Sequence, residues 1–264
     1  MKKLSKKAIL FLVVVTIINY LPIILTVVYS FNSSKISSVW GGTSIVWYKQ
    51  LFNDNDLRRS LINSLIVALF SCSFAVIIGT SAALAMRKTK LFFDNMISYF
   101  STLPIMIPEI ILGMAFLAVF SFFKMPFGFI TLIIAHTSFC IPYIFMLVRS
   151  RLIGMDPSYE EAAKDLGASS YETFRDIIVP YILPGILSGV LLSFAMSFDD
   201  VVISIFTTGP TVNTLAIKIY TKMKTGVTPE INALATVILL ISVICIFLFE
   251  IINKKSTNKT QTRY

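Results

Sequence analysis

The segment Met155–Pro180, MDPSYEEAAKDLGASSYETFRDIIVP, is the one long polar segment between strongly apolar ones. Its pattern predicts two short helices joined by a glycine. Asp156 is placed to cap the first helix, and Gly167 is placed to end it in a left-handed conformation. Ser169 and Glu172 have the spacing of a capping box at the start of the second helix. The segment therefore predicts a pair of capped helices between two apolar segments.

The first predicted helix has one narrow apolar face made partly of small side chains. The residues of this face recur at i, i+3, i+4 and i+7: Tyr159, Ala162, Ala163 and Leu166. Charged residues, among them Glu161, lie on the other side. A small face with charged flanks is suited to docking into a groove on another protein. The pattern alone agrees equally with a surface helix that has no partner.

Apolar segments surround this polar segment and extend over most of the chain. Of the 264 residues, 56% are hydrophobic and only 14% are charged, and the mean hydropathy is +0.80. This composition is not that of a soluble globular protein. Six runs are long enough to span a bilayer as helices. They cover about residues 8–31, 61–86, 96–123, 127–148, 177–206 and 232–252. The sequence therefore predicts an all-α integral membrane protein with six transmembrane helices in a single domain, residues 1–264.

Basic residues flank the apolar runs and do not form a polar face, which favours a topology signal over nucleic-acid binding. The start MKKLSKK resembles a secretory signal, but about twice the usual apolar length follows without a cleavage site, so we expect a retained first span. With the N-terminus inside, 15 of the 23 Lys and Arg residues fall on inner segments and 8 on outer ones. This bias predicts that both termini and the polar segment are cytoplasmic.

The cysteines Cys72, Cys140 and Cys245 each lie inside an apolar run. They are odd in number and far apart in the sequence, which indicates packing residues and neither a disulfide framework nor a metal site. The only histidine, His136, is expected to be a packed or hydrogen-bonded core residue and not a proton relay. No phosphate loop, Gly-rich nucleotide fingerprint or catalytic constellation is present. We therefore expect no enzymatic activity and no cofactor on this chain.

The polar segment resembles the EAA motif of ABC importer permeases. Glu161-Ala162-Ala163 is followed after three residues by Gly167, and after nine more by Ile177, one residue and Val179-Pro180, where the family has Leu-Pro. The resemblance implies the type I, MetI-like permease fold, with residues 57–252 as the core permease region. It also implies that residues 155–180, the EAA loop below, dock on a cytoplasmic ATPase.

In that family the EAA loop is the coupling helix, so the resemblance gives an ATPase-coupling role to four residues: Glu161, Ala162, Ala163 and Gly167. It further implies several partners. These are a second homologous permease subunit, two copies of the ABC ATPase and an extracytoplasmic binding protein. ATP and magnesium would be used by the ATPase. The expected location is the bacterial cytoplasmic membrane.

Three further stretches resemble the PotC-type permease subunits of spermidine/putrescine importers. They are STLPIMIPEIILGMAF (101–116), LSFAMSFDDVVISIFTTGP (192–210) and TLAIKIYTKMKTGVTPEINALAT (214–236). The similarity covers at least residues 63–252. It implies that the cargo is a polyamine, moved into the cytoplasm by alternating access. It does not rank spermidine against putrescine.

Acidic residues within apolar runs are the candidates for cargo contact, because a carboxylate inside a bilayer is costly unless it is paired or hydrated. Asp199 and Asp200 interrupt the fifth run, and Glu109 lies in the third. The fifth run is too long for one untilted span, so we expect a break that brings the acid pair toward a cavity. Polyamine ammonium groups suit carboxylates with aromatic walls, for which Tyr143 and Phe198 are candidates.

Alternatives remain open at this point. The acid pair would equally suit an outer helix cap that faces water. The same importer architecture serves other cargo, such as a metal ion or an anion, although the acids disfavour an anion. A secondary transporter would use Glu109 and the acid pair as proton sites, and its uptake would collapse with the proton gradient. A membrane enzyme is disfavoured by the lack of clustered His, Cys or nucleophile motifs.

Overall fold

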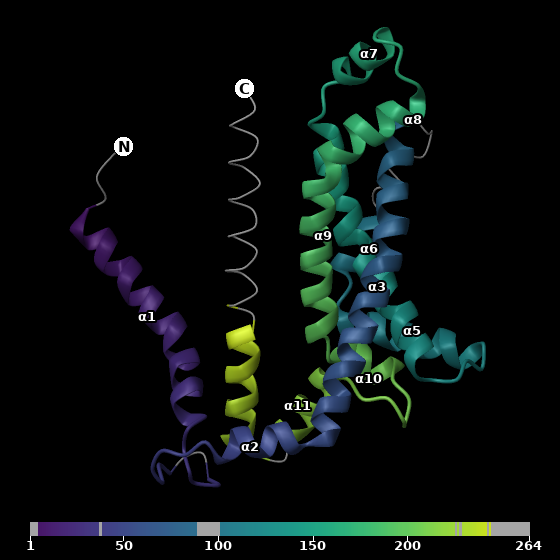
Figure 1. Ribbon diagram of the computed structural model, residues 1–264. Helices are drawn as coiled ribbons and strands as arrows, with labels where there is room; N and C mark the ends of the chain where they lie inside the picture. Colours follow the sequence, from purple (N-terminus) through teal and green to yellow (C-terminus); the bar gives the residue numbers. More distant parts are fainter. Residues whose placement is uncertain are drawn as a thin grey trace. The chain divides into compact units, whose positions relative to one another are not determined.

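The structure is a computed structural model that describes residues 5–36, 39–88, 101–224, 226, 229–241 and 243. Regular structure in these residues is helical throughout, apart from one isolated antiparallel bridge between Asn32 and Thr43 (Figure 1). The predicted all-α class is confirmed.

The helices follow one another along the chain with mostly short connections. Their bounds are α1 Lys6–Tyr29, α2 Val46–Asn53, α3 Asn55–Lys88, α5 Glu109–Phe122, α6 Phe129–Ile153, α7 Ser158–Asp165, α8 Ser170–Thr173, the π-helical turn η1 Phe174–Ile178, α9 Val179–Asp199, α10 Val202–Thr207 and α11 Leu215–Lys224. A further apolar helix covers Pro229–Ile241.

Four helices in the described part of the chain are long and apolar enough to cross a membrane. They are Lys6–Tyr29, Asn55–Arg87, Phe129–Ile153 and Ser170–Asp199. Two shorter apolar helices correspond to the third and sixth predicted spans: Glu109–Phe122 lies within the third, and Pro229–Ile241 overlaps the sixth but begins three residues before it. Residues 89–100 and most residues after 241 lie outside the described part, so the count of six stays a prediction.

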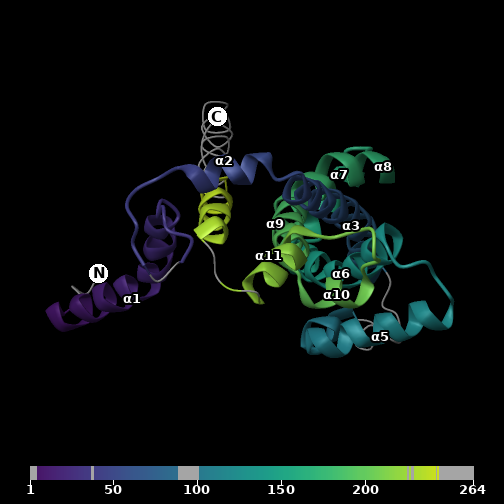
Figure 2. The same ribbon diagram turned by 90° about the horizontal axis from the view of Figure 1, so that it is seen from below.

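The chain divides into two compact units, one of residues 1–57 with 221–264 and the other of residues 58–220. In the second unit α6 lies at the centre and packs along α9, while α5 packs against α10. Figure 2 shows α3, α6 and α9 as neighbours when they are seen from below. The large fully buried side chains come mainly from α6, among them Leu132, Ile144 and Phe145. This unit carries the EAA loop and the acid pair.

Gly79 sets the approach of α3 to α6. A Cβ atom at this position would lie 3.1 Å from the carbonyl oxygen of Ile141 and 3.1 Å from the amide nitrogen of Phe145. Both are backbone atoms that cannot move aside like a side chain. The two helices therefore touch closely here because a small residue stands between their backbones.

The second helix of the EAA loop runs without interruption into the fifth span, so that α8, η1 and α9 form one helix over Ser170–Asp199. The turn Phe174–Ile178 is π-helical. Pro180 follows it and has no backbone N–H to donate to residue 176. The wider turn accommodates this missing hydrogen bond.

Candidate functional site

The EAA loop folds into the two short helices that its sequence predicts, although α7 begins at Ser158 and Pro157, not Asp156, directly precedes it. Asp156 Oδ1 accepts a hydrogen bond from the Ser158 amide at 2.9 Å, and this bond lowers the pKa of the exposed Asp156 carboxyl. Gly167 follows α7 with φ +86°, the left-handed conformation of a helix C-terminus. Ser169 Oγ accepts from the Glu172 amide at 3.3 Å, and Glu172 Oε2 accepts from the Ser169 amide at 2.7 Å. The predicted capping box is confirmed.

The apolar face of α7 is largely uncovered in this chain. Ala163 is buried, at 8% exposure. Tyr159 is 56% exposed and Leu166 is 90% exposed. Ala162 and Glu161 are exposed as well. Apart from Ala163, the residues of this face are therefore open to solvent among the described residues.

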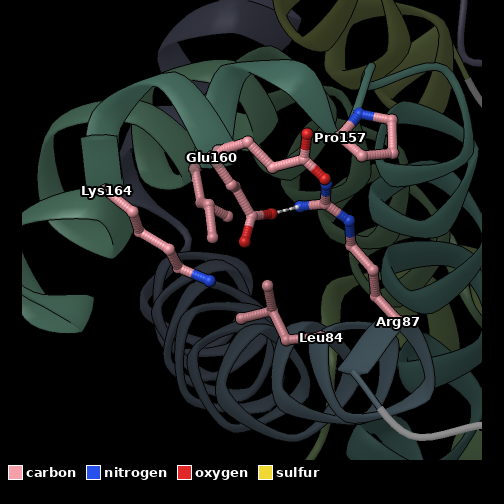
Figure 3. A pocket seen from close by; sticks show the side chains of 7 residues that line it. Leu84, Arg87, Pro157, Glu160 and Lys164 are labelled. Carbon is pink, nitrogen blue, oxygen red and sulfur yellow. Dashed lines mark ion pairs between the residues drawn. The ribbon is translucent and has the colours of Figure 1, made fainter. Parts of the chain in front are cut away.

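A cavity of about 270 Å³ lies between α7 and the end of α3 (Figure 3). Arg87 of α3 reaches into it and pairs with Glu160 of α7, with Nη1 and Oε1 2.5 Å apart. The same Nη1 donates to Met155 Sδ at 3.3 Å. The cavity is lined by Leu84, Arg87, Pro157, Glu160, Glu161, Lys164 and Ile178. The sequence does not predict this ion pair, because nothing in the spacing of Arg87 and Glu160 indicates that they meet.

A second cavity, of about 290 Å³, lies at the break between α9 and α10. It gathers four of the five residues predicted for the substrate pathway: Glu109, Tyr143, Asp199 and Asp200. The remaining lining residues are Pro104, Ile105, Ile107, Leu112, Phe139, Met196, Val201, Val202 and Ile203. Phe198 does not line it and stacks on Phe194, with ring centroids 5.9 Å apart. Phe139 supplies the aromatic wall in its place, a residue that the sequence analysis did not single out. We call this cavity the acid cavity.

The two adjacent acids have different environments. The predicted break is present, since α9 ends at Asp199 and α10 begins at Val202. Asp200 caps α10, because its Oδ2 accepts from the Ser204 amide at 2.7 Å and its Oδ1 from the Ile203 amide at 3.2 Å. Its side chain is only 5% exposed. Asp200 is therefore a helix cap, as one alternative held, but a buried one.

His136 completes a polar network around Asp200. Its ring is fully buried, with Nδ1 2.8 Å from Ser197 Oγ and Nε2 3.0 Å from Ser204 Oγ. Nε2 lies 3.5 Å from Asp200 Oδ2. The prediction of a hydrogen-bonded core histidine is confirmed. The network joins α6, α9 and α10 at the break.

Asp199 and Glu109 remain available on the wall of the acid cavity. Both are exposed, and Glu109 is the first residue of α5, directly after a break in the helix that precedes it. Within the part of the chain that the structure describes, no hydrogen bond or ion pair engages either carboxylate. Two unpaired carboxylates beside the rings of Tyr143 and Phe139 form a site suited to an organic cation.

Among the described residues no group of three or more His, Cys, Asp or Glu side chains is placed to hold a metal ion. Cys72 and Cys140 are buried free thiols, as expected of packing residues. Cys245 lies outside the described residues.

Comparison with known proteins identifies the family. The family model described as "Binding-protein-dependent transport system inner membrane component" matches residues 75–260. The chain is 38% identical over 238 residues to the spermidine/putrescine transport system permease protein PotC of Escherichia coli (strain K12), covering 90% of each chain. It is 38% identical over 227 residues to the putrescine transport system permease protein PotI of the same organism, covering 83% of this chain and 81% of the relative.

A solved structure supports the same fold. One chain of a bacterial ABC transporter involved in the import of the acidic polysaccharide alginate superposes with a TM-score of 0.71 at 14% identity. The match covers 96% of this chain and 99% of the other, and at this identity it bears on the fold alone. The fold, the capped EAA loop and the sequence similarity agree. The chain belongs to the family of binding-protein-dependent transport system inner membrane components, the permeases of ABC importers.

Proposed function

We propose that this chain is the permease subunit of an ATP-driven importer that moves polyamines, spermidine or putrescine, into the cytoplasm. Relatives that carry these cargo names match most of the chain. The observation that carries the cargo assignment is the acid cavity, in which no described residue pairs with Asp199 or Glu109, while Asp200 accepts hydrogen bonds from α10. The chain itself hydrolyses nothing.

The acid cavity has the chemistry that a polyamine requires. Each ammonium group of the cargo would donate charge-assisted hydrogen bonds to a carboxylate, Asp199 or Glu109. The methylene segment between two ammonium groups would lie against Tyr143 and Phe139, whose faces also attract cations. An anion would meet uncompensated negative charge here. The cavity therefore favours an organic cation over an anion.

The exposed face of α7 is the proposed docking surface for a cytoplasmic ATPase. Leu166 and Ala162 would enter a groove of that partner, where burying a leucine side chain contributes about 1.5–3 kcal/mol. Ala163 and Gly167 fix the position and the end of α7, and Glu161 lies beside the cavity shared with α3. ATP and magnesium would bind to the ATPase, and its closure would move α7.

The remaining assembly follows from this assignment. We propose a second homologous permease subunit, two copies of the ATPase and an extracytoplasmic polyamine-binding protein as partners. The location would be the bacterial cytoplasmic membrane, with both termini in the cytoplasm, as the distribution of Lys and Arg favours. The domain bounds 1–264 and 57–252 stay predictions.

The test is uptake of labelled spermidine by proteoliposomes that hold the complete complex. We expect uptake that requires internal ATP, is inhibited by unlabelled putrescine, and is unchanged by manganese, by amino acids or by a proton ionophore. Uptake that persists without the ATPase and collapses with the proton gradient would indicate a secondary transporter. Uptake of a competitor in place of spermidine would indicate another cargo.

A further inference from the structure

The helix α7 is held in place mainly by its own loop. Its N-terminus is fixed by Asp156, and its C-terminus by the hydrogen bond from the Ala168 amide to the Ala163 carbonyl. Ala163 is the one buried residue of the helix. These hydrogen bonds lie within residues 156–168, the stretch between α6 and α8.

Arg87 connects α7 to a helix that is distant in the sequence. It extends from the last turn of α3 to Glu160, and Figure 3 shows the two side chains meeting across the cavity. The side chains of Arg87 and Glu160 are 20% and 23% exposed, so solvent screens the pair only partly. The contact from Arg87 to Met155, a buried residue, holds the guanidinium at the same place. A displacement of α7 would therefore pull on α3.

The other part of α3 holds the chain that follows α10. Asn63 Nδ2 donates to the Asn213 carbonyl at 2.9 Å, and Ser64 Oγ accepts from the Leu215 amide at 2.8 Å. Between Asn63 and Arg87 the helix is continuous and contains no proline, and at 1.5 Å per residue it covers about 36 Å. Thus α3 reaches from the EAA loop to residues 213–215, which follow α10 in the chain.

We propose that α3 transmits the movement of α7 to residues 213–215, and that Arg87 is the positioning residue that joins α7 to α3. This rests on the proposed docking of an ATPase on the EAA loop. Movement of residues 213–215 would reach α10, whose Val202 and Ile203 line the acid cavity. The Arg87–Glu160 pair would then couple ATPase closure to cargo passage, and its loss would leave ATP hydrolysis running without transport.

The first test measures polyamine uptake per ATP hydrolysed by the complete complex. Arg87→Gln and Glu160→Gln should each lower this ratio about tenfold, within the usual range of coupling between sites, with hydrolysis maintained. The exchanged pair, Arg87→Glu with Glu160→Arg, should recover most of the ratio, which a merely structural role would not predict. Asp165→Asn removes an exposed carboxylate from the same helix and should leave the ratio unchanged.

An unchanged ratio in Arg87→Gln, or an exchanged pair no better than the single variants, would overturn the proposal. If the complex that carries Arg87→Gln does not assemble, Glu160→Gln and Arg87→Lys test the role of the ion pair instead. Glu160→Gln should uncouple, whereas Arg87→Lys keeps the charge and should retain most of the ratio. The opposite result in either variant would contradict the pairing.

A second measurement needs no cargo and so separates this proposal from the proposed function. Spin labels at Asp165→Cys on α7 and Ser81→Cys on α3, with Cys72, Cys140 and Cys245 replaced by alanine, report the distance between the two helices. We expect the same distance in the nucleotide-free and ATP-bound complex, and a changed distance in the ATP-bound complex after Arg87→Gln. A distance that changes with ATP in the presence of Arg87, or one that Arg87→Gln does not affect, would overturn the proposal even if polyamine uptake proves correct.

Discussion

The helix Ser170–Asp199, formed by α8, η1 and α9 (Figure 1), has acidic residues in different environments near its two ends. At its N-terminal end, in the EAA loop, Glu160 is paired with Arg87, and two large apolar side chains of the loop, Tyr159 and Leu166, are exposed. At its C-terminal end Asp200 accepts hydrogen bonds within the fold, whereas no described residue pairs with Asp199 or with Glu109 in the acid cavity. The paired acids, Glu160 and Asp200, stabilise the packing of the helices. The exposed apolar side chains of the EAA loop indicate a partner with an apolar groove. The carboxylates of Asp199 and Glu109 indicate a cation.

The largest expected effect concerns the apolar end. Leu166→Asp places a charge on the side chain that is 90% exposed in this chain and that we expect to be buried against the ATPase. Burying an unpaired carboxylate is costly, so the affinity of the ATPase for the permease should fall about 100-fold, equivalent to about 2.7 kcal/mol. Co-purification of the ATPase with the permease measures this. The neighbouring Asp165→Asn is the control, and an ATPase that binds both variants equally would place the docking surface elsewhere.

The next effect concerns an unpaired acid. Glu109→Gln keeps the size of the side chain and removes its charge, and a hydrogen bond to a charged group contributes about 1.5–3 kcal/mol. Spermidine uptake should therefore fall about tenfold or more, while thermal stability stays the same because no described residue pairs with Glu109. Uptake and thermal unfolding of the same preparation check both statements. Loss of stability without loss of uptake would make Glu109 a structural residue.

A smaller effect tests the close contact between α3 and α6 at Gly79. Gly79→Leu forces a side chain between the backbones of α3 and α6, and overpacking of this kind costs about 1–3 kcal/mol. The melting temperature should fall, and uptake should fall with it. Ser81→Leu adds the same side chain two residues away at an exposed position and is the matched control. Equal melting temperatures for the two variants would contradict the close contact.

The smallest effect concerns an ion cluster in the other unit. Lys222 Nζ lies 2.7 Å from Glu230 Oε1 and 3.3 Å from Asp54 Oδ2, so Glu230 has a partner beyond its helix-start position. Burial alone would lower the pKa of Lys222, but the two carboxylates raise it. Burial alone would raise the pKa of Asp54, but hydrogen bonds from the Leu57 amide and Lys222 lower it.

The sign of the pH dependence follows from these directions. The stabilisation from Asp54 is complete above its unfolded pKa of about 4 and is lost as the pH falls below that range. The stabilisation from Lys222 is complete below its unfolded pKa of about 10.4 and is lost as the pH rises above it. Lys222→Met should lower stability by about 1 kcal/mol at neutral pH, and the Lys49→Met control should not. Equal melting temperatures for Lys222→Met and Lys49→Met would show that the ion cluster does not stabilise the protein.

Local chemistry made much of the EAA loop predictable. The capping box of Ser169 and Glu172 and the left-handed Gly167 depend on residues within four positions of each other, so the sequence contains all the information required. The apolar runs predict the long helices for a similar reason. The Arg87–Glu160 pair could not be predicted, because it depends on how α3 packs beside the loop.

The sequence predicts most of the residues that line the acid cavity. It does not predict which of the two adjacent acids is buried and which is exposed. Asp199 and Asp200 are adjacent and chemically identical, and the end of α9 between them decides which one is buried. Phe198 precedes Asp199 by one residue, which turns it about 100° around the helix and toward Phe194 at i−4. The hydrogen-bond partners of His136, Ser197 and Ser204, lie on two other helices, α9 and α10, and the sequence does not indicate that the fold brings them to His136.

The most direct test of the difference between paired and unpaired acids compares Asp199→Asn with Asp200→Asn. Spermidine uptake and melting temperature are measured for both in the complete complex. Asp199→Asn should lower uptake about tenfold with an unchanged melting temperature, since it removes only a contact to the cargo. Asp200→Asn should lower the melting temperature as well as uptake, because its carboxylate caps α10 and lies against His136. Full uptake in Asp199→Asn, or equal melting temperatures for the two variants, would contradict the account.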